Sequence, residues 1–222
     1  MSTATSLTLH FHPLSSFCHK VLIALYENEI PFTPKLVNLR NEDERNALCK
    51  LWPIGKFPVL EDHARHRSVA ESTIIIEYLD EHYPGKVRLL PAERDLARQT
   101  RFRDRFFDLY IHAPMQKIVG DRLRPVDKKD AHGVEEARTQ MITALAMLDQ
   151  YMAKNTWATG ETFSMADCAA APALFYADKV MPFSTTHPNA AAYLQRLKER
   201  PSYARTLKEA EPYFKYFPKE SR

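Results

Sequence analysis

Hydrophobic and polar residues alternate at the start of the chain and then give way to helical spacing. Residues 7–12 (LTLHFH) alternate with a period of two, which predicts a half-buried strand that Pro13 ends. From about Ser16 the apolar residues recur at helical spacing until Pro31 closes the segment. Residues 32–39 are rich in β-forming residues, and their short distance from the first strand predicts that the two strands run parallel.

A hairpin and a further helix are predicted next. The charged segment 41–51 predicts at most a short surface helix. The apolar runs at 57–63 and 68–70 flank a polar turn and therefore predict a β-hairpin. The following segment is helical in pattern from Ser72, its expected cap, to the Pro-Gly pair at 84–85. The predicted order of elements is β-α-β-(α)-β-β-α.

Beyond residue 92 the pattern is helical and almost free of strand signals. Ser164 and Asp167 have the spacing of a capping box ahead of an alanine-rich apolar run, which predicts a buried helix. Amphipathic helices are predicted at about 93–121 and 134–153, and two further helices at about 188–199 and 202–210. The fold class is thus α/β plus all-α.

The domain boundaries follow from the same patterns. We predict an α/β domain over residues 1–84, a linker over 85–92 and an all-helical domain over 93–222. At 222 residues the chain is long enough for two small domains, each with its own core.

Composition excludes several classes of protein. The 31 Lys and Arg residues exceed the 28 Asp and Glu residues by only +3, too little to indicate a nucleic-acid or anionic-membrane partner. The 5 glycines lie far apart, which excludes a P-loop and a GxGxxG dinucleotide fingerprint. The N-terminal segment lacks the pattern of an export signal, and no run approaches the roughly 18 apolar residues of a membrane span.

Cysteine and histidine spacing predicts no metal site. Three widely spaced cysteines argue against a disulfide framework and against a cysteine-built zinc site, and they indicate a reducing cytoplasmic compartment. His63 and His66 form an H-x-x-H pair beside Asp62, but a hairpin turn without a third clear ligand favours a solvated turn.

The start of the first helix carries the main candidate chemistry. A helix N-terminus offers unpaired N–H groups and partial positive charge, so a thiolate beside Ser15, Ser16 and Cys18 is favoured over its thiol. The alternative is that both serines only cap the helix. Ser15 to Cys18 is also an S-x-x-C segment, which lacks the attacking cysteine needed for dithiol exchange. We expect Cys18 to pack as a small apolar residue.

Four motifs in order resemble the glutathione transferase family, in its bacterial or theta-like serine type. They are SSFCHKVLIAL at 15–25, PIGKFPVLED at 53–62, ESTIIIEYLDEHYP at 71–84 and FSMADCAAAPAL at 163–174. The resemblance spans nearly the whole chain. It implies that the N-terminal domain is thioredoxin-like and binds glutathione, and that the helical bundle domain forms an electrophile pocket and part of a dimer interface.

The resemblance implies an activity as well as a fold. We expect a cytoplasmic, homodimeric detoxification enzyme that transfers the glutathione thiolate to a hydrophobic electrophile, without a metal. Two alternatives remain open: a glutathione-dependent reductase or isomerase that uses Cys18, and a non-catalytic interaction protein of the same fold.

Roles for individual residues also follow from the resemblance. Ser15 is the expected catalytic residue, with Ser16 as the near alternative. The backbone of Phe57, turned outward by a cis bond to Pro58, pairs with the cysteinyl unit of glutathione. The other expected ligands are Glu71 for the γ-glutamyl ammonium, Ser72 for its carboxylate and Lys56 for the glycyl carboxylate.

The helical domain supplies three further candidates. Asp104 is expected to cross the dimer to the glutathione amine, or else to be a solvated charge paired with Arg101 or Arg105. Tyr110 and Met115, with Pro114, are expected on one side of an electrophile pocket between the domains, opposite Leu14 and Phe17. Ser164 and Asp167 are assigned to folding alone.

Overall fold

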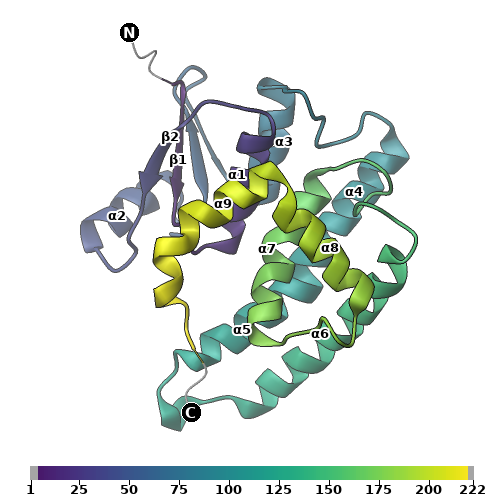
Figure 1. Cartoon of the computed structure of the whole chain (residues 1–222). Coiled ribbons are helices and arrows are strands. Elements are labelled where there is room, and N and C mark those ends of the chain that lie inside the picture. Colours follow the sequence, from purple (N-terminus) through teal and green to yellow (C-terminus); the bar gives the residue numbers. More distant parts are fainter. Residues whose placement is uncertain (1–4, 220–222) are drawn as a thin grey trace. The chain divides into compact units, whose positions relative to one another are not determined.

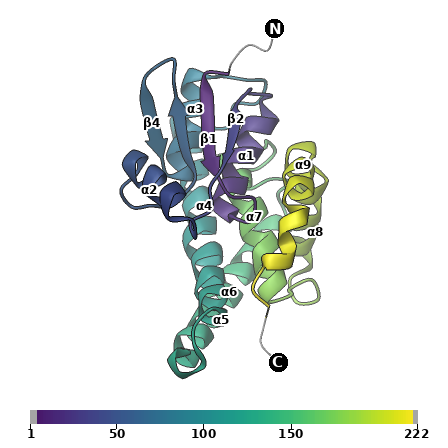
Figure 2. The same cartoon turned by 90° about the vertical axis from the view of Figure 1, so that its left-hand side faces the viewer.

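A four-stranded mixed sheet forms the centre of the N-terminal unit in the computed structural model, which describes residues 5–219 (Figure 1). The strands are β1 (Leu7–Phe11), β2 (Thr33–Leu36), β3 (Val59–Asp62) and β4 (Arg67–Ala70). Their order in the sheet is β2-β1-β3-β4, which can be followed in Figure 2. β2 runs parallel to β1, whereas β3 and β4 are antiparallel to their neighbours, which confirms the predicted parallel pair and hairpin.

Helices pack with this sheet, and they form in the segments that the sequence predicts to be helical. They are α1 (Ser16–Glu27), α2 (Glu42–Leu51) and α3 (Ser72–His82). Leu7 and Leu9 of β1 and Val21 of α1 are fully buried, as their spacing predicted. Leu48 of α2 packs with Val37 and Val59 in a separate apolar cluster. The thioredoxin-like βαβαββα order is therefore observed.

The C-terminal helix belongs to the first unit. α9 (Pro201–Ala210) packs along α1 (Figure 1). Ser202 donates to Glu27 at 2.8 Å, and Tyr26 donates to Glu209 at 2.5 Å. By packing, the first unit thus contains residues up to Leu90 together with Pro201–Tyr213.

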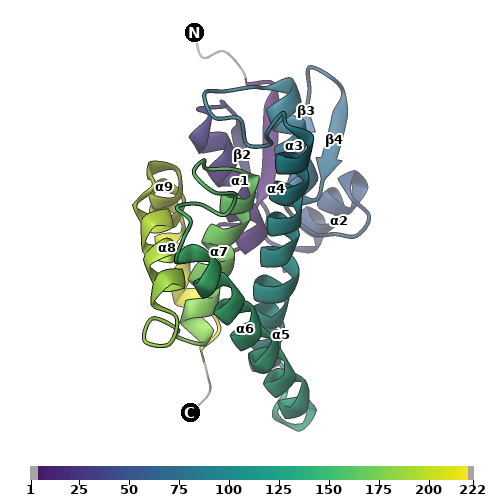
Figure 3. The same ribbon diagram turned by 90° about the vertical axis from the view of Figure 1, so that its right-hand side faces the viewer.

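The second unit is helical. Its helices are α4 (Arg94–Phe106), α5 (Ala113–Arg122), α6 (Ala131–Met152), α7 (Met165–Val180) and α8 (Pro188–Glu199), with a short 3-10 turn at Val126–Lys128. Another 3-10 segment, Glu211–Tyr216, follows α9. α4 continues through a π-helical segment, Phe107–His112, into α5, and α6 packs against α5 (Figure 3). The helix predicted at 93–121 is therefore interrupted by a π-helical segment. Among residues 5–219, no helix combines the length and the apolar character that crossing a bilayer requires.

A buried carboxylate begins α7. Asp167 is fully buried and accepts hydrogen bonds from Ala158 N at 2.8 Å, Ser164 N at 2.8 Å and Tyr193 Oη at 2.6 Å. The capping box predicted from Ser164 and Asp167 is present. Burial raises the pKa of Asp167, while these hydrogen bonds act in the opposite direction. The carboxyl thus links three segments of the second unit.

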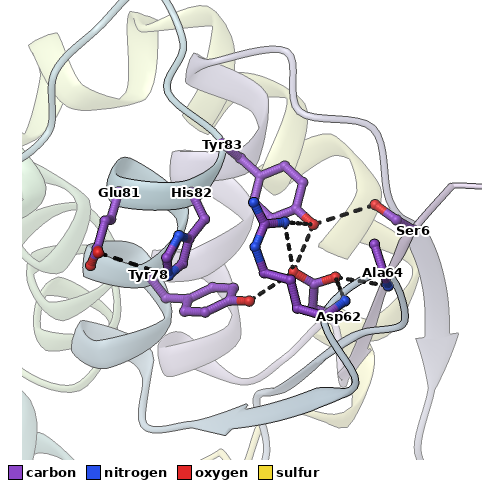
Figure 4. Close-up of polar contacts among 8 residues, drawn as sticks. Ser6, Asp62, Ala64, Tyr78, Glu81, His82 and Tyr83 are labelled. Carbon is purple, nitrogen blue, oxygen red and sulfur yellow. Dashed lines mark hydrogen bonds and ion pairs between the residues drawn. The ribbon is translucent and has the colours of Figure 1, made fainter.

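A second buried carboxylate closes the hairpin of the first unit (Figure 4). Asp62 is 1% exposed and accepts from Tyr78 Oη at 2.7 Å and from Tyr83 Oη at 2.6 Å. The backbone of Ala64 and the backbone and side chain of Arg65 also donate to it. Burial opposes ionisation, but the two tyrosines and Arg65 together hold the pKa of the carboxyl below its usual range.

Replacing Asp62 is expected to destabilise the chain in a pH-dependent way. Asp62→Asn should lower the free energy of unfolding at pH 7 by about 1 to 3 kcal/mol, because the hydrogen-bond donors around this position would then face a neutral amide instead of a carboxylate. Folded Asp62 binds its proton more weakly than the unfolded chain does, so its stabilisation is present above the unfolded pKa and is lost as pH falls through the folded pKa. Urea unfolding from pH 7 to pH 3 should show the difference from wild type shrinking. Glu81→Gln, which changes an exposed carboxylate on α3, serves as the control.

Loss of Asp167 should be more severe and confined to folding. Asp167→Ala leaves the buried Tyr193 hydroxyl and two backbone N–H groups without their acceptor, so we expect a loss of about 3 kcal/mol or more. Asp127→Ala, at an exposed position of the same unit, should change stability by less than about 0.5 kcal/mol. Equal unfolding midpoints for the two variants would contradict the assignment.

Candidate functional site

The candidate ligand residues gather at one end of the sheet because of strand direction. β1 ends, β3 begins and β4 ends at the same edge, since β3 is antiparallel to both neighbours. His10 pairs with Val59, and Val59 pairs with Ala70. The Ser15 loop (residues 12–15), the cis-proline loop (residues 53–58) and Glu71 therefore lie next to one another.

Ser15 occupies the N-cap position of α1. Its Oγ accepts from Cys18 N at 3.3 Å, and its own N–H donates to His12 O at 2.9 Å. Ser15 thus caps the helix, but an accepting hydroxyl still has its O–H to donate. The side chain is partly exposed at the positive end of a helix. Capping and thiolate stabilisation are compatible at this residue.

Ser16 and Cys18 have different surroundings. Ser16 is 7% exposed and lies in the first turn of α1. Cys18 is fully buried, and burial raises the pKa of its thiol to about 12, against hydrogen bonds with Ser15 and His12 that act to lower it. A thiol in this state is neither nucleophilic nor a good metal ligand. Cys18 packs as the small apolar residue that the sequence predicted.

The cis-proline loop has the predicted backbone. The Phe57-Pro58 peptide bond is cis, and Pro58 is buried at the start of β3. Gly55 adopts φ +67° within the loop, a conformation that residues with a Cβ rarely adopt. Phe57 is partly buried and packs on the cluster of Val37, Leu48 and Val59, whereas Lys56 is exposed.

The start of α3 differs from the expectation in one respect. Glu71, not Ser72, is the N-cap, and it makes no side-chain cap hydrogen bond. Its φ of 68° lies in the left-handed region, an unusual conformation for a non-glycine residue that is often retained where it serves a ligand. Ser72 is 6% exposed in the first helical turn. The Glu71 side chain is exposed at the shared edge of the sheet.

Three residues at this edge were not predicted from the sequence. His12 stacks on Phe57 with ring centroids 6.0 Å apart, and Tyr213 meets His12 edge-on at 5.7 Å. Lys20 is 1% exposed, and its Nζ donates to Thr73 Oγ1 at 2.8 Å, which ties α1 to the first turn of α3. The strand pattern marked His12 only as a polar position, and the approach of Tyr213 from the far end of the chain has no local signal.

The three candidates in the helical unit differ in their exposure to solvent. Asp104 is fully buried, which fits neither a carboxylate extended across a dimer nor a solvated helix charge. Met115 is 3% exposed and packs in the interior, whereas Tyr110 is 45% exposed on the π-helical segment. Of these three, Tyr110 alone offers a substantial surface to a ligand.

The H-x-x-H pair lies on the hairpin turn. His63 Nε2 is 2.9 Å from Thr8 Oγ1, and His66 has a φ of 52°. The adjacent Asp62 is buried within its tyrosine and arginine contacts. Among residues 5–219, no group of three or more His, Cys, Asp or Glu side chains is arranged to hold a metal ion.

Known proteins of this architecture are similar along the whole chain. A glutathione S-transferase U25 of Arabidopsis thaliana is 31% identical over 218 residues, covering 95% of this chain and 92% of that protein. A stringent starvation protein A homolog of Haemophilus influenzae is 28% identical and covers 96% of this chain and 97% of its own. The crystal structure of a glutathione S-transferase from Methylobacillus flagellatus, with glutathione bound, superposes with a TM-score of 0.84 at 25% identity, over 90% of this chain and 98% of that one.

Family models match both halves. The glutathione S-transferase N-terminal domain matches residues 9–87, and the C-terminal domain of the same family matches residues 131–196. These ranges contain the Ser15 loop, the cis-proline loop, Glu71 and the capping box of α7. Since the two models together match more than half of the chain, this protein belongs to the glutathione S-transferase family.

Proposed function

We propose that this chain is a glutathione transferase: it binds glutathione at the edge of the sheet, and Ser15 stabilises the thiolate that attacks an electrophilic small molecule. The observation that carries the proposal is the meeting of a helix N-terminus bearing Ser15 with the cis Phe57-Pro58 peptide at one sheet edge. The glutathione held by the similar Methylobacillus flagellatus structure supports the same ligand. A cytoplasmic homodimer is part of the proposal.

The groups at the edge of the sheet match the parts of a glutathione molecule. The backbone of Phe57 suits the cysteinyl unit, as an added half-strand. The exposed Glu71 carboxylate suits the γ-glutamyl ammonium, and the N-terminus of α3 with Ser72 suits its carboxylate. Lys56 is exposed and free to meet the glycyl carboxylate. Tyr110 stays the candidate contact for the electrophile.

Burial separates Ser15 from its two neighbours. A residue that donates to the ligand sulfur must present its donor, and Ser15 is partly exposed while Ser16 and Cys18 are buried. A reductase or isomerase that uses Cys18 would require a thiolate, and the pKa of about 12 for this thiol argues against one at neutral pH.

A non-catalytic protein is the second candidate function. One comparison favours it, because a relative along almost the whole chain is named a stringent starvation protein A homolog rather than a transferase. Fold alone does not decide between the two functions. A measurement of electrophile turnover distinguishes a transferase from a non-catalytic protein.

Glutathione should raise the melting temperature. A ligand that binds only the folded chain stabilises it by RT ln(1 + [L]/Kd), about 2.7 kcal/mol at a concentration of 100 Kd. Differential scanning fluorimetry and calorimetric titration measure the effect, with S-methylglutathione as a probe that lacks the ionisable thiol. An unmoved melting curve and no heat of binding would refute the transferase and leave the interaction protein.

Ser15→Ala should change the ionisation of glutathione more than its affinity. A charge-assisted hydrogen bond is worth roughly 1.5 to 3 kcal/mol, so we expect the pKa of the bound thiol to rise by about one to two units and turnover at pH 7 to fall about tenfold to hundredfold. Thiolate absorbance against pH and turnover of an aryl halide give the two readouts.

Two control variants accompany Ser15→Ala. Glu93→Ala removes the N-cap of α4, which should lower the free energy of unfolding by about 0.5 to 2 kcal/mol. It therefore reproduces the loss of stability expected from removing the Ser15 cap, while the Ser15 loop stays unchanged. Cys18→Ala should keep turnover. If Ser15→Ala kept full activity and Ser16→Ala lost it, the catalytic role would belong to Ser16.

A further inference from the structure

His12 connects the Ser15 loop to the cis-proline loop through its ring. The ring lies nearly parallel to Phe57, at an interplanar angle of 18° and a centroid distance of 6.0 Å. Tyr213 contacts it edge-on, at 75° and 5.7 Å. Aromatic pairs of this geometry contribute about 0.5 to 1.5 kcal/mol beyond the area that they bury. The imidazole is therefore held by two partners, one of which precedes the cis peptide bond.

The same ring also holds the backbone next to Ser15. Leu14 N donates to His12 Nδ1 at 3.2 Å, so the hydrogen of the neutral ring is on Nε2. Burial lowers the pKa of His12, which keeps Nδ1 an acceptor at neutral pH. The contact reaches two residues along the chain, as in a turn made by an asparagine side chain.

Two further contacts fix this loop. Ser15 N donates to His12 O at 2.9 Å, and His19 Nε2 donates to Pro13 O at 2.6 Å. His19 anchors the loop to the body of α1, whereas His12 alone among these contacts reaches the cis-proline loop. The placement of Ser15 relative to the Phe57 backbone thus depends on His12.

We propose that His12 is a positioning residue for Ser15: its Nδ1 holds the Leu14 amide while its ring rests on Phe57, so that the Ser15 hydroxyl and the Phe57 backbone face one glutathione molecule in a fixed geometry. This inference rests on the proposed function and adds a residue to it. A misplacement of about 1 Å at a reacting group can cost up to about a hundredfold in rate.

Substitutions at His12 separate the contributions of its aromatic ring, of Nδ1 and of Nε2. His12→Phe keeps the ring but removes the acceptor, so kcat should fall about tenfold and the pKa of the bound thiol should rise by about one unit, with KM for glutathione changed less than about threefold. His12→Asn places an amide oxygen where Nδ1 was and should retain kcat within about threefold. His12→Gln carries its amide near the position of Nε2 and should behave like His12→Phe. Tyr216→Phe, at an exposed tyrosine, is the matched control and should leave kcat and the thiol pKa as in wild type.

The outcomes distinguish this inference from the function on which it rests. Equal kcat and thiol pKa in His12→Phe and wild type would overturn the positioning role alone. If His12→Gln retained kcat and His12→Asn lost it, the positioning role would also be overturned, because Nε2 would then donate directly to the ligand. The Asn and Gln variants decide the matter even where His12→Phe does not fold. Wild-type protein that binds no glutathione overturns the proposed function and this inference together.

Discussion

Strand β1 pairs with a parallel neighbour on one side and an antiparallel neighbour on the other, and this arrangement determines where the candidate ligand groups lie. Because β3 returns against β1 and β4 returns against β3, the chain passes the same edge of the sheet three times. Each passage leaves a different group there: a capped helix N-terminus, a cis peptide and a strained acidic residue. The groups that would meet one ligand come from separate parts of the sequence.

Two buried carboxylates stabilise the two units, and their pKa values shift in opposite directions. Both are almost inaccessible to solvent and both accept hydrogen bonds from tyrosine and from backbone N–H groups. Asp62 also has a guanidinium group at 3.4 Å, and the pKa of its carboxyl is lowered. For Asp167 burial outweighs the hydrogen bonds that it accepts, and its pKa is raised. For Asp62 the hydrogen bonds from the two tyrosines and from the backbone of Arg65 outweigh burial, and the charge of the Arg65 guanidinium acts in the same direction.

Much of this fold could be predicted because the signals are local. Alternation in 7–12, helical spacing after Ser16 and the capping box at Ser164 each follow from residues a few positions apart, and all are observed. The features that the sequence did not reveal depend on distant residues. Burial of Asp104, the approach of Tyr213 to His12 and the packing of α9 on α1 arise only when helices pack together. The left-handed φ of Glu71 likewise has no residue-type signal, because glutamate rarely adopts it.

The burial of Cys18 has a consequence for the durability of the protein. Electrophiles react with thiolates, and a thiol whose pKa is about 12 is almost entirely protonated in the cell. If an electrophile reaches the Ser15 loop as proposed, the reactive sulfur that it meets belongs to glutathione and leaves with the product. The sulfur of the polypeptide at this loop is shielded from alkylation and oxidation, so repeated encounters with reactive compounds consume the small molecule and spare the protein.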